Sequence, residues 1–452
     1  MSVTIKNPTL LITAIALGAI LNPLNTTMIT VALSSIQQDF ELSSTDISWL
    51  IASYFIVSAI FLPIIGRLSD YYGRKRIFLI GLLLVLISSV LAPMSKSMMM
   101  LLSMRLIQAL GTSALYPAGI GMVRLYIKQN QNRVIGTLAV FATTSAAFGP
   151  TISGLLIQYG GWPVIFYVNL PVIFLSALLT WFYIPKDEPT KGTALFKWDV
   201  VGMILFSAFI TSWMVFLLSL EGGFDVWSLI LSIGLSILFY SYEKKKADPL
   251  INVVFLQKNP TISVIYVQYI LSTLIFFAIL LFTPIYLQEV VELGSKYTGL
   301  MMLALSVFAM ITTPLATRWA ERVGYRIPLL VGAGIGIIGV AFLYITTKNS
   351  SLLWIVIVLA VFGISNGLMN ISLQNLLYSF ISVAQTGIAS GLLMTSRFIG
   401  NILASSIYGV VFAIGLNDMS KNSMTIVLLA VSLVIIPGML YVTNQKVKRE
   451  QW

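Results

Sequence analysis

Residues 66–76 have the sequence GRLSDYYGRKR, and a degenerate copy, TRWAERVG, occupies residues 317–324, 251 positions later. The same shift, without a gap, pairs six positions over about 85 residues: Pro63 with Pro314, Arg67 with Arg318, Asp70 with Glu321, Gly73 with Gly324, Gly136 with Gly387, and Gly149 with Gly400. Duplicated helical bundles are how many secondary transporters are built, with the substrate site between the halves near the membrane midplane. The repeat therefore predicts two related halves.

The composition predicts a membrane protein. Hydrophobic residues make up 58% of the 452 positions and charged residues only 10%, whereas a soluble domain needs about 25% charged residues to cover its surface. Apolar segments long enough to cross about 30 Å of hydrocarbon recur along the chain. We expect fourteen spans, near residues 10–34, 47–66, 77–94, 99–123, 134–157, 164–184, 200–219, 227–242, 262–287, 298–316, 328–346, 352–373, 387–414 and 424–443.

The spans fall into groups of six, two and six. We predict a six-helix bundle over residues 1–184, a linker with two extra transmembrane helices over 185–258, and a second bundle with a short cytoplasmic tail over 259–452. The first apolar run is about 25 residues long, beyond the length of a signal-peptide core, so we expect it to remain as a span. The expected fold is an all-α membrane protein of two related bundles plus two inserted helices.

The basic residues orient the chain. Of the 27 Lys and Arg, 21 fall in segments that this topology places in the cytoplasm, four fall outside, and Arg105 and Arg397 lie within spans. By the positive-inside rule, this asymmetry predicts that both termini are cytoplasmic. It also accounts for the net charge of +11 without a nucleic-acid partner.

The chain has no cysteine and no histidine. Disulfides and thiolate metal sites are therefore excluded, and the side chain most often used to carry protons near neutral pH is missing. All sixteen acidic residues fall near one membrane face or the other in the predicted topology. We therefore expect neither an enzyme nor a metal site, and no cofactor other than a proton gradient.

The stretch at residues 66–76 suits a gate. We expect Gly66 and Gly73 to permit tight turning and close helix contact, and Asp70 to cap a helix or pair with an arginine. The positive-inside rule alone accounts for the basic residues of the stretch, but not for its Gly-x₃-Asp-x₂-Gly frame. That frame resembles the signature loop of the major facilitator superfamily. The resemblance implies a gating role for Gly66, Arg67, Asp70, Gly73 and Arg74.

Three other stretches narrow the resemblance to the fourteen-span drug:proton antiporter branch of that superfamily. They are Arg105, Gln108, Gly111 and Pro117 in the fourth span; Gly136, Ser145, Gly149, Pro150 and Gly154 in the fifth; and Trp162, Phe166, Asn169, Leu170 and Pro171, followed by Asp199, Gly202, Pro249, Leu250 and Phe255. Ser145 stands where a glycine is usual. Gly149, Pro150 and Gly154 would tighten the fifth helix against a neighbour and limit leak, although routine Gly/Pro packing is the alternative.

The resemblance implies a multidrug efflux transporter in a bacterial plasma (inner) membrane. Its partners would be small-molecule substrates, protons and the lipid bilayer, and we expect a monomer.

Polar residues in the first and fourth spans are candidates for the working site. A charge within a span is functional by default, so Arg105 is assigned to proton coupling, with a structural donor to carbonyls as the alternative. Gln108 and Thr112 follow on its helical face. Asn22 and Asn25 share a face of the first span, and with Tyr54 they are expected to line the substrate cavity. Relatives of this branch have an aspartate where this chain has Asn25.

The missing aspartate leaves the proton carrier open. Our first candidate is Asp46, for which a helix cap is the alternative, and Glu221 and Glu289 come next. In the second half, four residues are assigned to the substrate cavity: Phe276, Asn366, Asn370 and Arg397. Aromatic walls of this kind suit a promiscuous site, although most such side chains serve packing.

The leading hypothesis is a proton-coupled antiporter that exports hydrophobic or cationic drugs by alternating access. The alternative on the same fold is an exporter or importer of a single metabolite. A channel and a sensor without flux are the remaining possibilities.

Overall fold

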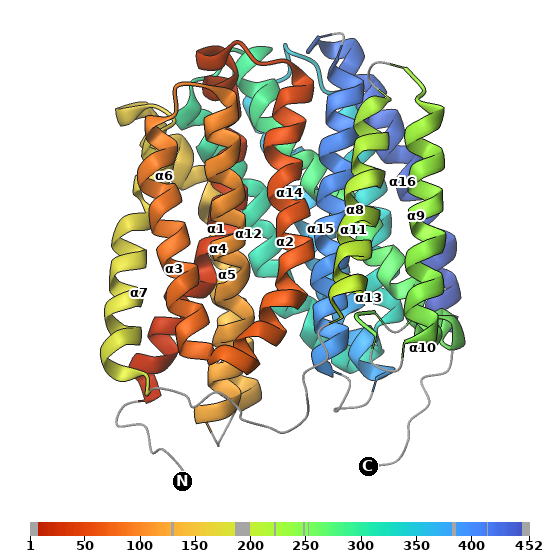
Figure 1. Ribbon diagram of the computed structural model, residues 1–452. Helices are drawn as coiled ribbons and strands as arrows, with labels where there is room; N and C mark the ends of the chain where they lie inside the picture. Colours follow the sequence, from red (N-terminus) through yellow and green to blue (C-terminus); the bar gives the residue numbers. More distant parts are fainter. Residues whose placement is uncertain are drawn as a thin grey trace. The chain divides into compact units, whose positions relative to one another are not determined.

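A computed structural model describes residues 8–127, 131–185, 199–220, 223–246, 249–251, 253–381, 386–413 and 415–444. This part of the chain is helical and contains no strand. The helices (Figure 1) are α1 (Pro8–Phe40), α2 (Ser44–Tyr72), α3 (Arg74–Leu91), α4 (Met98–Tyr126), α5 (Gln131–Gly160), α6 (Val164–Tyr167), α7 (Asn169–Tyr183), α8 (Val200–Ser219), α9 (Val226–Lys245), α10 (Val253–Lys258), α11 (Pro260–Glu289), α12 (Ser295–Val323), α13 (Arg326–Ile345), α14 (Leu352–Ser379), α15 (Thr386–Phe412) and α16 (Asp418–Asn444), with a short 3₁₀ helix at Ala92–Met94.

Among the described residues, twelve helices are long and apolar enough to cross a membrane, and α8 and α9 are among them. The helices α5 and α15 are not in that set, although they have 30 and 27 residues. The expectation of fourteen spans therefore stays a prediction.

The span predicted near residues 164–184 is interrupted. The chain makes a turn at Val168, which separates α6 from α7. Pro171 explains the break, because it has no N–H to donate to the carbonyl of Tyr167, one turn earlier in the hydrogen-bond ladder. The interruption places Asn169 at the start of α7, where it faces α1.

The helix bounds obey the shift of 251 residues found in the sequence. Adding 251 to the bounds of α2 gives residues 295–323, which are the bounds of α12. The same operation carries α3 close to α13, and α4 close to α14. The structure therefore shows that the duplication extends to whole helices and is not limited to the short motifs.

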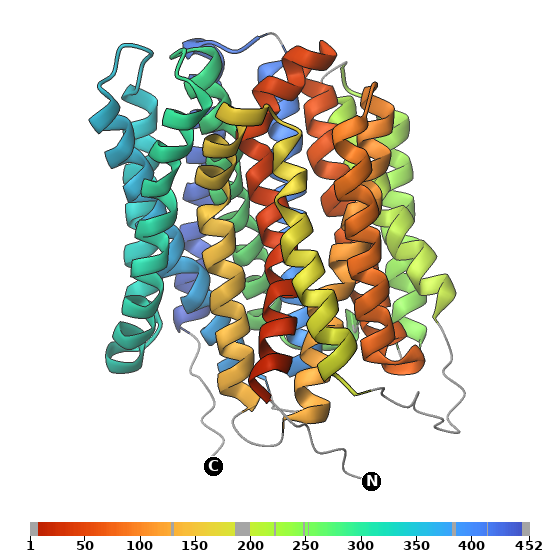
Figure 2. The ribbon, with the colours of Figure 1, turned by 90° about the vertical axis from the view of Figure 1, so that its left-hand side faces the viewer.

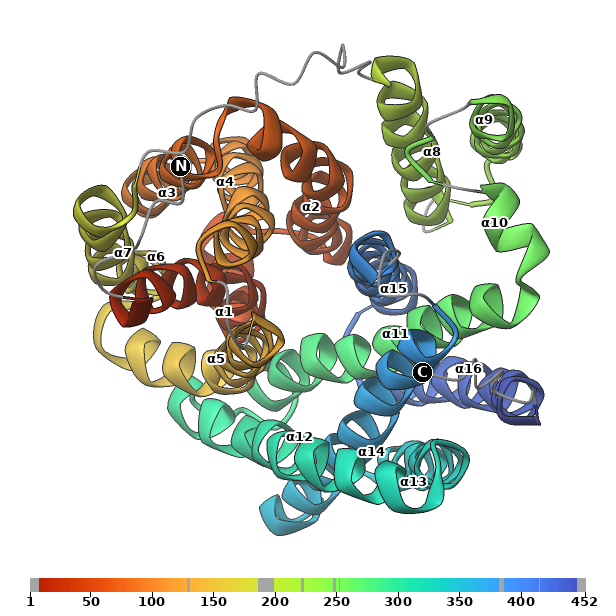
Figure 3. The same cartoon turned by 90° about the horizontal axis from the view of Figure 1, so that it is seen from below.

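Two compact units can be separated by their internal contacts. Unit 1 comprises Met1–Leu42 and Ser53–Asp199, and unit 2 comprises Ser43–Ala52 and Val200–Trp452. The helices α8 and α9 pack against each other and belong to unit 2, where α8 contacts α15 and α10 contacts α11 (Figure 3). The predicted division at residues 184 and 258 stays a prediction.

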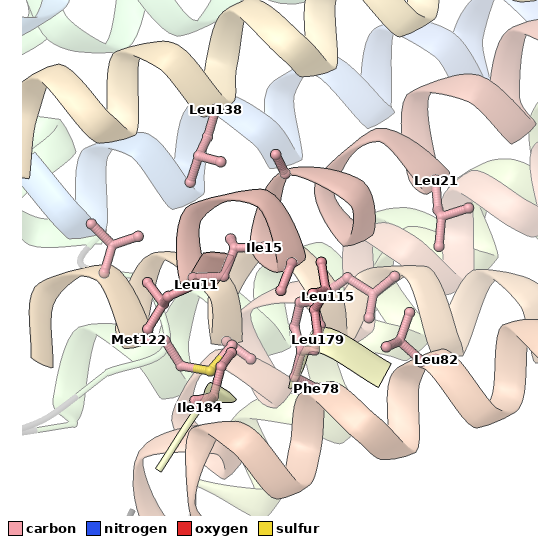
Figure 4. Packing of buried hydrophobic residues seen from close by; sticks show 14 of the residues in the cluster. Leu11, Ile15, Leu21, Phe78, Leu82, Leu115, Met122, Leu138, Leu179 and Ile184 are labelled. Atoms are coloured by element: carbon pink, nitrogen blue, oxygen red, sulfur yellow. The ribbon is translucent and has the colours of Figure 1, made fainter. Parts of the chain in front are cut away.

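In unit 1, α1 packs against α4, α5, α6 and α7; Figure 2 shows α1, α5 and α7 running side by side, and Figure 3 shows α1 among its neighbours end on. A fully buried apolar cluster joins α1, α3, α4, α5 and α7 (Figure 4). Its centre is Phe78, whose ring lies against Gly18 of α1 and close to Gly119 of α4. The apolar cluster fixes the position of α1, the helix that carries Asn22 and Asn25.

Glycines at matching positions of the repeat allow neighbouring helices to pack closely in both units. A Cβ atom at Gly81 would lie 2.8 Å from the Gly111 carbonyl oxygen, and one at Gly111 would lie 2.7 Å from the Gly81 oxygen. In unit 2, Gly332, which is 251 residues after Gly81, packs against α14, and a Cβ there would lie 2.9 Å from Leu368 Cβ. Contacts this short admit only a hydrogen atom, so glycine is required for the helices to approach.

The first prediction concerns the α3–α4 contact. Gly111→Leu should lower the melting temperature of the purified protein and its monodisperse yield, because overpacking a close contact typically costs about 1–3 kcal/mol. The matched control is Gly234→Leu in α9, since a Cβ at Gly234 would have no neighbour within 4 Å. Thermal unfolding followed by tryptophan fluorescence in detergent measures both. An equal loss of stability in the two variants would contradict the assignment of the contact.

Candidate functional site

Arg105 lies inside α4 with only 2% of its surface exposed. Its Nη1 donates a hydrogen bond of 2.6 Å to Gln108 Oε1, one helical turn further on. Its guanidinium carbon lies 4.3 Å from the centre of the Tyr54 ring, in cation–π contact. Its Nε–H finds no acceptor among the described residues. The buried charge is therefore held by an amide oxygen and a ring face.

A chain of buried amides continues from Gln108. Gln108 Nε2 donates to Asn25 Oδ1 at 3.0 Å. Asn25 and Asn169 exchange two hydrogen bonds, of 3.1 and 2.8 Å, and Asn25 Nδ2 also donates to the Leu21 carbonyl at 2.7 Å. Asn169 Nδ2 reaches Ser89 Oγ at 3.3 Å. Asn25 thus uses both its oxygen and its NH₂ group, and its surroundings suit an amide rather than a carboxylate.

Hydroxyl groups form the second branch of the same network. Tyr54 OH and Thr112 Oγ1 lie 2.7 Å apart, and Asn22 Nδ2 donates to both, at 3.3 and 3.1 Å. Tyr54 and Thr112 are buried, whereas Asn22 is half-buried and is the most exposed member of the network. The structure thus unites five of the predicted cavity residues of unit 1 with Arg105: Asn22, Asn25, Tyr54, Gln108 and Thr112.

The α5 motif seals the other side of α1. A Cβ atom at Gly149 would overlap the Thr27 hydroxyl, so that α5 approaches α1 at a distance that only glycine allows. Ser145 Oγ, where glycine is usual, donates to the carbonyl oxygens of Ala142 at 2.8 Å and Ile20 at 3.4 Å. Pro150 and Gly154 are buried in the same helix. The motif therefore packs on the helix that carries Asn22 and Asn25.

The signature loop, residues 66–76, shows the expected glycine conformation at Gly73 but not the expected turn at Gly66. Gly73 has φ +98° and its repeat partner Gly324 has φ +83°, a conformation that requires glycine. The expectation of a turn at Gly66 was wrong, because Gly66 lies inside α2, where a Cβ would make only ordinary contact with Pro117. Arg74 Nη1 donates to the Gly121 carbonyl at 2.6 Å. The side chains of Arg67 and Asp70 are outside the described residues.

Two of the three candidate proton carriers, Asp46 and Glu289, are described by the structure, and both belong to unit 2. Ser43 donates to Asp46 Oδ2 from its amide at 3.0 Å and from its hydroxyl at 2.7 Å, and the Asp46 amide donates back to Ser43 Oγ at 3.2 Å. This reciprocal capping box supports the helix-cap interpretation of Asp46. Glu289 is exposed in the last turn of α11, and Glu221 is outside the described residues. Their roles in proton coupling stay predictions.

Unit 2 has no equivalent of the polar network at the matching positions. The shift of 251 takes Arg105 to Val356 and Asn25 to Phe276. Phe276 and Asn366 line a cavity of about 20 Å³ between α11, α13, α14 and α16, which holds about one water molecule. Asn370 accepts from Tyr269 OH at 3.3 Å, and Arg397 is half-buried in α15. The assignment of these residues to the substrate cavity stays a prediction.

Two contributions were missed from the sequence. Asn169 was noted as part of a motif but not placed in the site, although a polar residue in an apolar span was the available signal. Ser89 had no such signal. Lys421, one of the four basic residues that the predicted topology places outside, is 1% exposed, and its ammonium donates to carbonyl oxygens of Leu343, Tyr344 and Thr346 at the C-terminus of α13. A cation is favourable there because the helix dipole is negative at this end.

Comparisons with known proteins are consistent with this architecture. A family model described as Major Facilitator Superfamily matches residues 15–405. An uncharacterized MFS-type transporter, YwoD, of Bacillus subtilis is 39% identical over 90% of this chain and 91% of its own. The multidrug resistance protein Stp of Mycobacterium tuberculosis is 29% identical over 90% of this chain and 76% of its own. A bacterial homolog of the human lysosomal transporter Spinster, solved in an inward-facing and occupied conformation, superposes with a TM-score of 0.70 at 14% identity, covering 98% and 97% of the two chains.

The second prediction tests the amide network. Asn25→Leu should lower the melting temperature by several degrees, because it leaves buried donors on Gln108 and Asn169 unpaired, at a cost of about 1–3 kcal/mol each. Thr13→Val on the same helix is the control, since the Thr13 hydroxyl is exposed and bonds only its own helix. Thermal unfolding in detergent is the measurement. Equal melting temperatures for wild type and Asn25→Leu would show that the network contributes no stability.

The third prediction separates the two interpretations of Asp46. Asp46→Asn keeps an acceptor for the Ser43 donors, so the cap interpretation expects unchanged stability and unchanged pH-driven flux. Asp46→Ala removes the acceptor and should lower stability by about 1 kcal/mol. Thermal unfolding and flux into proteoliposomes measure the pair. Loss of flux in Asp46→Asn with stability intact would instead make Asp46 a proton carrier.

Proposed function

The chain belongs to the major facilitator superfamily, and we propose that it uses this transporter fold to export small hydrophobic molecules from the cytoplasm in exchange for protons. The family and the relatives indicate a multi-pass membrane transporter and not an enzyme. Export, proton coupling, fourteen spans, cytoplasmic termini, a bacterial inner membrane and a monomeric state belong to the proposal.

The proposal rests on the close contact between α1 and α5 at Thr27 and Gly149, which we call the seam. In alternating access the two repeats move against each other around the substrate site, and an exchanger must not leak protons while they do so. Glycine at position 149 lets α5 approach α1 at the Thr27 hydroxyl, next to the turns of α1 that hold Asn22 and Asn25. A seam of this kind, directly behind the polar network, suits an exchanger that must not leak.

The relative named as a multidrug resistance protein supports export of hydrophobic compounds. The energy source is supported less directly, because the described part of the network around Arg105 contains amides, hydroxyls and a ring, but no carboxylate. We therefore propose Glu289 and Glu221 ahead of Asp46 as proton carriers. Asp46 is already engaged in capping α2.

One observation favours a second candidate, the carrier of a single metabolite. Asn25 forms four hydrogen bonds to fixed partners. A rigid site in which Asn25 has all its hydrogen bonds made suits selective recognition more than a promiscuous site, whose walls adapt to many ligands. A narrow substrate range in transport would support this candidate.

The fourth prediction is the functional test. Proteoliposomes with an imposed pH gradient should accumulate some members of a set of neutral, cationic and anionic fluorescent compounds, and transport should dissipate the gradient. Gly149→Leu should abolish accumulation, because the added side chain separates α5 from α1.

Gly234→Leu serves as the control, since a side chain there has open space. No accumulation by wild-type protein, with the gradient intact, would refute proton-driven export. Unchanged accumulation in Gly149→Leu would remove the seam from the mechanism.

A further inference from the structure

We infer that the substrate carries an anionic group of carboxylate size, which becomes the counter-ion of Arg105. This inference rests on the proposed export function and names the substrate class of its unit 1 site. It starts from an imbalance of charge. Arg105 is 2% exposed, and its described partners, Gln108 and the Tyr54 ring, are both neutral.

A buried cation without a paired anion is costly. Removing an ion from water costs several kcal/mol even after the protein relaxes, and good geometry with an opposite charge offsets that cost. Here one amide oxygen at 2.6 Å and one ring face at 4.3 Å provide partial solvation only. The Nε–H of Arg105 is buried and has no acceptor among the described residues. The guanidinium thus keeps capacity for an incoming oxygen anion.

The network does not supply this anion from within. An aspartate at position 25 would compensate Arg105 through Gln108, but the partners of Asn25 require an amide. Its NH₂ group faces two carbonyl-type oxygens, Leu21 O at 2.7 Å and Asn169 Oδ1 at 3.1 Å, which would repel a carboxylate. The surroundings of Asn25 therefore keep the site positive. A positive site favours an anionic ligand and disfavours a cationic one.

The geometry also suits a small planar anion. The guanidinium fork binds a carboxylate through parallel N–H···O bonds, which gives direction as well as affinity. Asn22 Nδ2 donates to Tyr54 OH and Thr112 Oγ1, and Asn22 is the network member that the structure leaves half-buried. Because the substrates of the proposed function are hydrophobic, this carboxylate would carry an apolar body. The class is therefore a hydrophobic carboxylate.

Three probes of one size and three charges test the inference. Benzoate, benzamide and benzylammonium are added to the purified protein near neutral pH, at one chloride concentration, and their dissociation constants are obtained from the shift in melting temperature. We expect benzoate to bind about tenfold or more tightly than the other two, the difference that one charge-assisted hydrogen bond contributes. Equal or absent shifts for the three probes would overturn the inference.

Two variants test whether the preference for benzoate depends on Arg105. Gln108→Glu keeps the shape of Gln108 and places a carboxylate on Arg105 Nη1, so it should remove the preference for benzoate by at least about tenfold. Arg105→Gln should do the same. Gln288→Glu, near the end of α11, adds the same charge elsewhere and should leave the preference unchanged. If Arg105→Gln fails to fold, the nearly isosteric Gln108→Glu still tests the inference. A benzoate preference retained in Gln108→Glu would contradict the assignment of the carboxylate to Arg105.

Measurements of binding and of transport together distinguish a failure of this inference from a failure of the proposed function. A benzoate preference that depends on Arg105, without any flux under a pH gradient, would refute the export function and leave the inference intact. Flux that is indifferent to substrate charge and unchanged in Arg105→Gln would refute the inference and leave the export function intact.

Discussion

The burial of one positive charge organises the N-terminal unit. Arg105 lies inside α4 at 2% exposure, and the helices around it must present polar atoms at its level. Tyr54 comes from α2, Asn25 from α1 and Asn169 from α7. Leaving a buried polar group unpaired costs more than a net hydrogen bond contributes, so each of these polar groups needs its partner in place in the folded unit. The position of α1 in contact with α4, α5 and α7 follows from this requirement as much as from apolar packing.

The two units share close helix contacts at matching glycine positions, but they differ in the polarity of several buried side chains. Gly81 and its repeat partner Gly332 both seal a helix pair. Gly149 and its partner Gly400 do so as well, the former on α1 and the latter on α11, where a Cβ would lie 2.6 Å from the Ile270 carbonyl oxygen. Positions without a backbone constraint diverged, so that Val356 occupies the repeat position of Arg105. The buried Arg105 is thus not matched in unit 2, where Val356, Phe276 and Leu359 stand at the positions of Arg105, Asn25 and Gln108. Asn22 and Asn169 correspond to the polar residues Thr273 and Ser420.

The sequence was sufficient where a feature depends on composition or on a local backbone constraint. The apolar runs and the repeat predicted the helices, and the frame around Gly73 predicted a glycine conformation that the structure shows. It was insufficient where the outcome depends on tertiary partners. Gly66 lies within α2, which continues to Tyr72 before the chain turns at Gly73. Lys421 is buried because the carbonyls ending α13 lie against α16, a contact that hydropathy does not encode. The pairing of Asn25 with Asn169 crosses 144 positions in the chain.

The arrangement of the Arg105 network has a consequence for how the protein is made. Chains enter the membrane from the N-terminus, so Arg105 reaches the bilayer while α7 has not yet been synthesised. Asn169, which completes the bonding of Asn25, arrives last among the network residues. Until then the amide network is incomplete, and its polar groups have to be hydrated or shielded by the insertion machinery. Unit 1 should therefore reach its native packing as a set of helices released together, not as helices that leave the machinery one at a time.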